Sequence, residues 1–355
     1  MLECSLKSYL NRLTTQPLNN PDEILSYRHQ DLNGATIHPL QPRKRLHDHK
    51  NELLVCHDMR GNYLNDRFNI GASYGNAYQI MQWDVIDIFC YFSHHMITIP
   101  PITWINVAHH HGTQIMGTFI TEWDAGAIHC SVLFATESSS KLLANQLVAI
   151  AEDYLLDGWL INIENKLNPD VEVPNMIIFL TTLTEIMHLK RPGSKVIWYD
   201  AVTVEGNLHW QDSLSPLNRP FFDVCDGLFV NYTWSDESLV KSISLAGPDR
   251  VPNMYYGIDV FGRGTPGRGE YNCGESVKLL SHHNLSVALF APGWLLETQI
   301  NESACFDVVQ NEFVEKSLLF WHDIIHIWKS RKTNISPYNS PRERERENEK
   351  EREEE

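Results

Sequence analysis

The chain has 355 residues, 43% of them hydrophobic, and can therefore bury a sizeable core in one large domain with tails. Its formal net charge of −16 argues against a nucleic-acid backbone as the main partner. No stretch approaches the roughly 20 consecutive apolar residues that span a bilayer, which predicts a soluble protein without a membrane partner.

The cysteines and the N-terminal sequence predict a cytosolic location. Seven cysteines are scattered, odd in number and never spaced as C-x-x-C, which is typical of reduced thiols rather than of a disulfide framework. The first residues lack a basic region followed by an apolar run, so we expect no secretory signal. Four N-x-S/T triplets, at Asn231, Asn284, Asn301 and Asn334, are accordingly interpreted as chance matches.

The two ends of the chain differ in composition from its middle. Residues 1–50 contain four prolines and little periodicity, which predicts an extended arm packed on the domain, with a basic cluster at Arg43, Lys44 and Arg45. Residues 331–355 end in RERERENEKEREEE, a mixed charge run that predicts a disordered tail to which we assign no function. The expected domain is therefore a barrel over residues 51–330.

Short apolar runs alternate with amphipathic stretches throughout this middle region. The apolar runs predict strands buried on both faces, at ELLVCHD (52–58), DVIDIFCYF (84–92), QIMGTFI (114–120), DGWLINIE (157–164), KVIWYD (195–200), GLFVNY (227–232), NMYYGIDV (253–260) and SVALFAPG (286–293). Helical spacing recurs between and after them, at residues 140–155, 176–189 and 311–329. Eight strands alternating with helices predict an α/β fold, the TIM (β/α)8 barrel, rather than an open doubly wound sheet.

Active sites of such barrels lie at the C-terminal ends of the strands, and polar and aromatic residues collect there in this sequence. Carboxyl groups can act as acids or bases, and Trp faces stack on sugar rings, so this combination suggests a carbohydrate site. We expect Trp159 in the core, and we expect Trp210, Trp234 and Trp294 to be exposed. The further candidates for substrate contacts at or after strand ends are His57, Glu122, Trp123 and Asn231.

The strand DGWLINIE ends in an amide and a carboxyl group that point to the same side, Asn162 and Glu164. Ordinary glycosidases need two carboxyl groups, but the neighbour of Glu164 is an amide. In substrate-assisted hydrolysis a 2-acetamido sugar supplies its own nucleophile and forms an oxazoline. Asn162 could then hold the acetamido group, while Glu164 acts first as acid and later as base.

Several long motifs resemble the cytosolic endo-β-N-acetylglucosaminidases of glycoside hydrolase family 85. They include LLVCHDMRGNYLNDRF, DGWLINIEN, VIWYDAV and SVALFAPGW, in this order along the predicted barrel. The resemblance implies a TIM barrel that hydrolyses the β-1,4 bond in the N,N'-diacetylchitobiose core of N-linked glycans, by a retaining substrate-assisted mechanism. It implies N-linked glycans, glycopeptides or free oligosaccharides as substrates, and no cofactor or metal.

The same resemblance implies roles for individual residues. Asn162 would orient the reacting acetamido group, Glu164 would be the general acid/base, and Tyr199 would help to place the acetamido group. Trp210 and Trp234 would line the sugar sites. Contact roles are implied for a further set of residues in matching motifs, namely His57, Glu122, Asn231 and Trp294.

Alternative interpretations remain beside this one. The run GRGTPG (262–267) fits G-x-G-x-x-G, but Pro266 makes a poor helix start, so we expect a loop. The histidines at 94–95 and 109–111 lack the HExxH spacing of a zinc protease and are expected on the surface or behind the site. Larger family members carry β-sandwich regions after the barrel, which we expect to be absent here. A non-catalytic glycan-binding barrel or an inactive truncated isoform therefore stays open, although a pure binder has no need of a proton donor.

Overall fold

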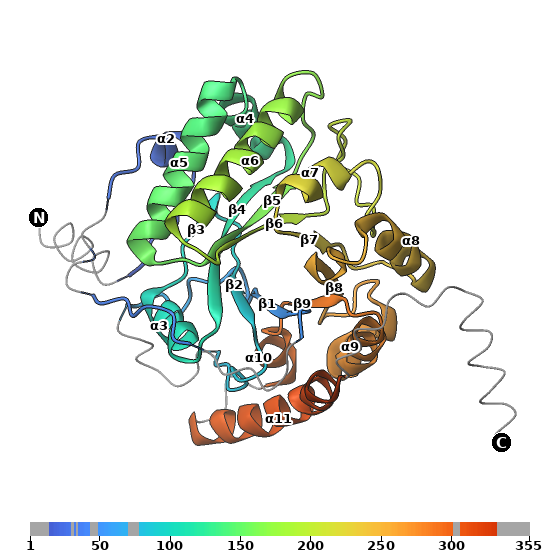
Figure 1. The fold of residues 1–355 in the computed structure, drawn as a ribbon. Coiled ribbons are helices and arrows are strands. Elements are labelled where there is room, and N and C mark those ends of the chain that lie inside the picture. The colour runs from blue at the N-terminus through green and yellow to red at the C-terminus, as the bar shows by residue number, and fades with distance from the viewer. Residues whose placement is uncertain are drawn as a thin grey trace, which may run out of the picture.

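The computed structural model describes residues 14–29, 32, 35–42, 49–69, 78–300 and 306–331. Parallel strands close into a barrel (Figure 1), and these are β1 (Leu53–His57), β2 (Ile88–Tyr91), β4 (Gln114–Glu122), β5 (Gly158–Glu164), β6 (Lys195–Tyr199), β7 (Gly227–Val230), β8 (Met254–Asp259) and β9 (Ser286–Phe290). The barrel closes because β1 pairs with β9 and β2 pairs with β4. The predicted (β/α)8 fold is confirmed, and each predicted run overlaps one of these strands, although β4 extends two residues beyond its run.

A short additional strand, β3 (Ile97–Thr98), was not predicted. It pairs antiparallel with β4 beyond the point where β2 stops pairing with β4, and so continues the hydrogen bonding along that edge. The described part of the N-terminal arm adds to it, because Leu18 and Ile97 exchange backbone hydrogen bonds of 3.0 and 2.9 Å. The basic cluster at 43–45 and the chain from 332 onward lie outside the described residues, so the division into arm, barrel and tail stays a prediction.

Helices surround the barrel (Figure 1), and they are α2 (Pro21–Leu25), α3 (Ile102–His110), α4 (Trp123–Leu133), α5 (Glu137–Tyr154), α6 (Glu172–Lys190), α7 (Arg219–Val224), α8 (Asp236–Ala246), α9 (Cys273–His282), α10 (Trp294–Gln299) and α11 (Phe306–Ser330). Short 3₁₀ turns lie at η1 (Val251–Asn253), η2 (Pro266–Arg268) and η3 (Glu270–Asn272). The three predicted helices are confirmed as α5, α6 and α11. Thr136 begins α5 with a capping box, in which its hydroxyl accepts the Ser139 N–H.

Side chains of the strands alternate between two apolar layers. The layer inside the barrel includes Leu54, Ile88, Met116, Leu160, Ile197 and Phe229. On β5 the residues that pack outward against the helices are Trp159, Ile161 and Ile163. Trp159 is fully buried, as predicted. Because the period of a strand is two, Asn162 and Glu164 must then face the inside of the barrel.

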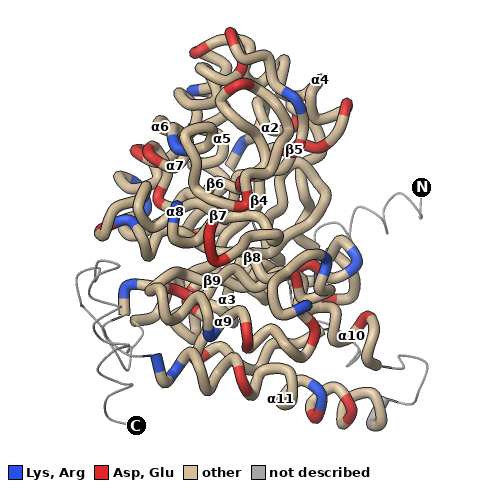
Figure 2. Tube along the Cα trace, turned by 90° about the vertical axis from the view of Figure 1, so that its right-hand side faces the viewer, with Lys and Arg blue, Asp and Glu red and all other residues tan. Residues whose placement is uncertain are grey.

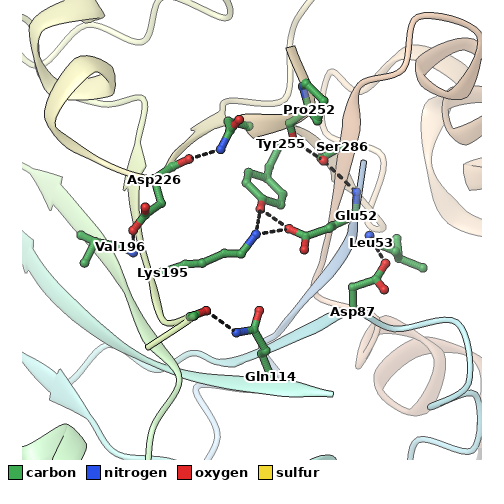
Figure 3. A network of polar contacts seen from close by, with 12 residues as sticks. Glu52, Leu53, Asp87, Gln114, Lys195, Val196, Asp226, Pro252, Tyr255 and Ser286 are labelled. Atoms are coloured by element: carbon green, nitrogen blue, oxygen red, sulfur yellow. Dashed lines mark hydrogen bonds and ion pairs between the residues drawn. The ribbon is translucent and has the colours of Figure 1, made fainter. Parts of the chain in front are cut away.

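A polar network closes the N-terminal end of the barrel (Figure 3). Glu52 accepts hydrogen bonds at one carboxylate oxygen from the Tyr255 hydroxyl (2.5 Å) and from Lys195 Nζ (2.6 Å). Neighbouring carboxylates fasten the starts of other strands, since Asp87 accepts the Leu53 N–H and Asp226 accepts the Val196 N–H. Polar contacts at this end of a TIM barrel serve stability, because the reactive face is the opposite one.

The structure also shows the state of the cysteines and the distribution of charged residues. The cysteines that the structure describes, at 56, 90, 130, 225 and 273, are free and buried, in agreement with the predicted reduced state, whereas Cys4 and Cys305 lie outside the described residues. Figure 2 shows acidic and basic positions interspersed along the described trace. Among the described helices, none combines the length and apolar character needed to cross a membrane.

The network predicts a measurable loss of stability when Lys195 is replaced. The change Lys195→Met leaves the Glu52 carboxylate buried without its cation. Breaking a buried ion pair costs about 3–5 kcal/mol, and because the Lys195 side chain is 23% exposed we expect about 2–3 kcal/mol, measured by urea unfolding at pH 7. The control Lys141→Met breaks an exposed pair with Glu137, which solvent screens, and should cost much less than Lys195→Met. Equal losses in the two variants would contradict the assignment.

Candidate active site

A cavity of about 250 Å³ opens at the C-terminal ends of the strands. Four of the predicted site residues, Glu122, Asn162, Glu164 and Tyr199, meet in its wall. The remaining lining residues are Cys56, Phe92, His94, Leu160, Phe229, Tyr232, Asp259, Arg263 and Phe290. The cavity therefore combines carboxyl, amide and phenol groups with aromatic surface, as a sugar site requires.

Asn162 and Glu164 lie side by side in this wall. The Asn162 side-chain N–H donates to Glu164 Oε1 at 2.9 Å. The other end of the amide, Asn162 Oδ1, is buried and has no hydrogen-bond partner in the described chain. A buried acceptor without a partner is costly, so this oxygen is available for an N–H group supplied by a ligand.

The surroundings of Glu164 favour its protonated form. Burial raises the pKa of Glu164 above its usual range, and the neighbouring carboxylate of Glu122 acts in the same direction. The hydrogen bond from Asn162 and the nearby His94 oppose this rise. Glu122 and Glu164 are paired positions of β4 and β5, which explains why the two carboxyl groups influence each other. A carboxyl group with a raised pKa can donate a proton near neutral pH.

Tyr199 is held by a chain of hydrogen bonds that runs behind the cavity. Its hydroxyl donates to Asn231 Oδ1 (2.8 Å), and Asn231 Nδ2 donates to Asp212 Oδ1 (2.7 Å). The backbone N–H of Thr233 also donates to Asp212 Oδ1. Burial raises the pKa of Tyr199 well above its usual range, so the phenol keeps its proton. Asn231, predicted as a substrate contact, thus lies behind Tyr199 and outside the cavity lining.

Asp200 fastens the loop that carries Trp210 and Asp212. Its Oδ2 accepts the backbone N–H groups of Gln211 (3.1 Å) and Asp212 (2.8 Å), and its Oδ1 accepts from Asn218 Nδ2. Burial raises the pKa of Asp200 to about 7, although these hydrogen bonds act to lower it. Trp210 is half-buried and packs against the layer inside the barrel. The strand-end rule placed Asp200 near the site. Asp212 and the hydrogen bonds that Asp200 makes to the loop were not predicted, because they join positions far apart in the sequence.

Two charged pairs at the cavity were also missed. His94 Nδ1 lies 3.0 Å from Glu122 Oε2, and the guanidinium of Arg263 binds both oxygens of Asp259 at 2.6 and 3.1 Å. His94 was expected on the surface or behind the site, and Arg263 lies in the GRGTPG run that was expected to form a loop. That run does form a loop with a short 3₁₀ turn. Asp259 ends β8, where the strand-end rule placed it, but its pairing with Arg263 was not predicted.

Three predicted substrate contacts lie away from the cavity. Trp234 and Trp294 are only 3% and 4% exposed, so the expectation that they are exposed is wrong. Trp234 donates its indole N–H to Gly257 O, and Trp294 packs edge-on against Tyr271. These large rings gain more by filling the outer layer beneath the loops than by contact with water. His57 is enclosed by aromatic rings on the outer side of β1 and cannot contact a ligand in the cavity.

Trp123 is the strongly exposed member of the predicted set. It directly follows the cavity residue Glu122, and 72% of its surface is exposed. Its φ of +56° lies in the left-handed region, which is costly for a bulky residue. The described residues contain no group of three or more His, Cys, Asp or Glu side chains arranged to hold a metal ion.

The fold and the cavity define a (β/α)8 barrel with a carboxyl group and an amide side by side at the C-terminal ends of its strands. The profile of glycosyl hydrolase family 85 matches residues 62–351, and the chain belongs to this family. It is 45% identical over 307 residues to cytosolic endo-beta-N-acetylglucosaminidase 1 of Arabidopsis thaliana, covering 86% of this chain and 44% of that protein. The cytosolic endo-beta-N-acetylglucosaminidase of Homo sapiens is 42% identical over 321 residues, covering 88% of this chain and 42% of that protein.

The chain thus spans less than half the length of these relatives. Among solved structures, the Endo-D glycoside hydrolase domain of Streptococcus pneumoniae R6 matches with a TM-score of 0.67 at 20% identity, covering 84% of this chain and 50% of that chain. This match supports the fold. The predicted family is confirmed by the profile and by the curated relatives together.

The enclosure of His57 predicts a dependence of stability on pH. Burial lowers the pKa of His57 to about 4, and neither ring nitrogen has a hydrogen-bond partner within the described ranges. Between pH 6.5 and 4 the unfolded chain binds a proton that the folded chain does not, so stability falls as pH falls. From pH 7 to pH 4.5 this group alone should cost about 2–3 kcal/mol.

The variant His57→Phe removes this titration while keeping an aromatic ring. We expect its free energy of unfolding, from urea titrations at both pH values, to fall by about 2–3 kcal/mol less than that of the wild type. Identical losses in the two proteins would show that His57 is accessible to protons in the folded state.

Proposed function

We propose that this chain hydrolyses the β-1,4 bond between the two core N-acetylglucosamines of N-linked glycans. The observation that carries the proposal is the buried, unpartnered Asn162 Oδ1 beside Glu164 in the cavity. The names of the curated relatives support the same activity. They also support the cytosol as its location, and glycopeptides or free oligosaccharides as the substrates encountered there.

The proposed reaction begins with the 2-acetamido group of the sugar. Asn162 Oδ1 accepts the acetamido N–H and directs the acetamido carbonyl oxygen toward the anomeric carbon. As that oxygen forms its bond to the anomeric carbon, the glycosidic C–O bond breaks and Glu164 donates its proton to the departing oxygen. The product on the first sugar is a protonated oxazoline (an oxazolinium ion), whose N–H proton stays hydrogen-bonded to Asn162 Oδ1. The other fragment leaves with a free hydroxyl group on its N-acetylglucosamine.

In the second step Glu164 is ionised and acts as a base. It takes a proton from a water molecule whose oxygen attacks the anomeric carbon, and the oxazoline ring opens to restore the acetamido group. Tyr199, oriented by Asn231 and Asp212, borders the space for the acetamido group and limits its orientations. Trp123 and Trp210 are the proposed stacking surfaces for further sugar rings, since both retain exposed area.

A two-carboxylate mechanism is the main alternative, because Glu122 stands beside Glu164. In that mechanism Glu122 would attack the anomeric carbon itself. Two contacts favour the substrate-assisted route. Glu122 is already paired with His94 through both carboxylate oxygens (3.2 and 3.0 Å), and the free amide oxygen of Asn162 would have no task in a two-carboxylate mechanism. A barrel that only binds glycans has no need of a proton donor such as Glu164.

The wild type should release the glycan from a high-mannose glycopeptide and leave one N-acetylglucosamine on asparagine. Glu164→Gln removes the transferable proton and should lower kcat about a hundredfold to ten-thousandfold while the fold is retained. Mass spectrometry of the products and circular dichroism of the variant provide the two measurements. An intact glycopeptide after incubation with folded wild-type protein would reject the hydrolase proposal, and undiminished turnover by the variant would remove Glu164 from the acid role.

Asn162→Ala should separate the two steps of the reaction. Loss of the amide leaves the acetamido group poorly aimed, so cleavage of the glycopeptide should fall at least about a hundredfold. Hydrolysis of a preformed sugar oxazoline should fall much less, because that substrate has already closed its ring. The exposed change Asn145→Ala serves as the matched control. Equal activity of Asn162→Ala and the wild type on the glycopeptide would reject the role of Asn162.

A further inference from the structure

Three titratable side chains form a row at one wall of the cavity. Glu122 and Glu164 are paired in register at the ends of β4 and β5 and both line the cavity. His94, from the segment after β2, contacts the far side of Glu122 through Nδ1, at 3.0 and 3.2 Å from the two carboxylate oxygens. Its ring is held edge-on by Phe92 at a centroid distance of 5.5 Å.

Other charged or titratable groups surround this row. Asp58 acts electrostatically on both Glu122 and His94, and burial raises the pKa of the cavity thiol Cys56 well above its usual range, so the thiol stays neutral. Asp259 is neutralised by Arg263 after β8, and Asp58 after β1 accepts the Gly61 N–H. The phenols of Tyr199 on β6 and Tyr232 after β7 are buried enough to raise their pKa well above the usual range, so both stay neutral. The neutral amide of Asn162 faces Glu164 on β5 itself. Glu122 therefore remains as the neighbouring charge, and His94 is its counter-ion.

We propose, resting on the function proposed above, that Glu122 and His94 are positioning residues that set the pH range in which Glu164 holds its proton. An ionised Glu122 disfavours a second negative charge beside it, which keeps Glu164 protonated for the cleavage of the glycosidic bond. A protonated His94 offsets part of that charge, so that Glu164 can still ionise and act as base on the oxazoline. The pair thus balances two steps that need opposite states of one carboxyl group.

Substitutions in the pair should move the pH profile in opposite directions. Cleavage of the glycopeptide requires protonated Glu164, so the alkaline limb of kcat/KM follows its ionisation in the free enzyme. Glu122→Gln removes the neighbouring negative charge and should move this limb about half to one pH unit lower. His94→Gln removes the counter-ion and should move it higher by a similar amount.

The hydrolysis of a preformed oxazoline reports the protonation state of Glu164 in a second, independent assay. Its hydrolysis requires ionised Glu164, so activity is lost on the acid side of the profile. Glu122→Gln should move this acid limb lower, and His94→Gln should move it higher, in parallel with the glycopeptide limbs. A residue with a merely structural role would lower rates without moving either limb.

Two neighbouring residues provide matched controls. His95→Gln alters a histidine that faces Asn19 of the N-terminal arm, and Asp124→Asn alters an exposed carboxylate two residues after Glu122. Neither residue lines the cavity, and neither variant should move the limbs. Thermal unfolding of every variant establishes that the proteins compared are folded, and His94→Gln tests the idea alone if Glu122→Gln does not fold.

The experiment can overturn this inference without overturning the proposed function. If the wild type cleaves the glycopeptide but neither limb moves, the inference fails alone. If Glu122→Gln abolishes cleavage at every pH and added azide restores turnover, Glu122 is a nucleophile and both this inference and the substrate-assisted mechanism fail. A carbon-13 NMR titration of Glu164, assigned with Glu164→Gln, tests the coupling without turnover. Opposite shifts in the two variants support the inference, whereas an unchanged titration rejects it.

Discussion

The packing of one strand between two apolar layers determines what the site can be. Trp159, Ile161 and Ile163 of β5 fill the outer layer against the helices, and this leaves the alternate positions to the inside of the barrel. Among these inward-facing positions, Leu160 lies near the middle of the strand and belongs to the inner core. Asn162 and Glu164 follow it toward the C-terminal end. A slip of one residue in register would place both polar side chains in the outer layer, where each would be costly to bury. Apolar packing outside the barrel therefore aims the amide and the acid inside it.

Tyr199 depends on a different kind of support, because it is oriented through hydrogen bonds from a long loop. Asp200 binds the backbone at 211 and 212, and Asp212 in turn binds Asn231, which binds the Tyr199 hydroxyl. The tip of this loop is anchored separately, since Leu167 donates its N–H to Gly206 O. A Cβ at Gly206 would lie 2.1 Å from Leu167 O, and its φ of +74° also favours glycine. The loops after β5 and β6 thus approach closely, and they hold Asn162, Glu164 and Tyr199 in one arrangement.

Local patterns were sufficient to predict the barrel and its central residues. Each apolar run overlaps a strand, because a strand buried on both faces is apolar at nearly every position. The strand ends placed Glu122, Asn162, Glu164 and Tyr199 at the cavity. The same rule failed for Trp294, since a residue just past a strand can turn into the outer layer or toward the cavity, and the sequence contains no signal for that choice. His94 and Asp212 act through contacts with residues 28 and 19 positions away, respectively, and such pairings follow from the closed fold. Asn231 was expected to contact substrate, whereas its hydrogen bond with Tyr199 follows from the same kind of distant contact.

A single carboxyl group that serves as both acid and base places a strict demand on its surroundings. In a two-carboxylate glycosidase the environments of two groups can be tuned separately, whereas here any interaction that favours the proton on Glu164 also opposes its later ionisation. Burial raises the pKa of Glu164 and so favours its protonated form, whereas the hydrogen bond from Asn162 lowers the pKa and favours the ionised form. Glu122 and His94 act on Glu164 in opposite directions and so balance each other. The hydrogen bond with Glu122 raises the pKa of His94, which favours the charged imidazolium that offsets the Glu122 carboxylate. The hydrogen bonds that the Glu122 carboxylate accepts from His94 Nδ1–H would then matter to the chemistry even though neither residue transfers the reacting proton.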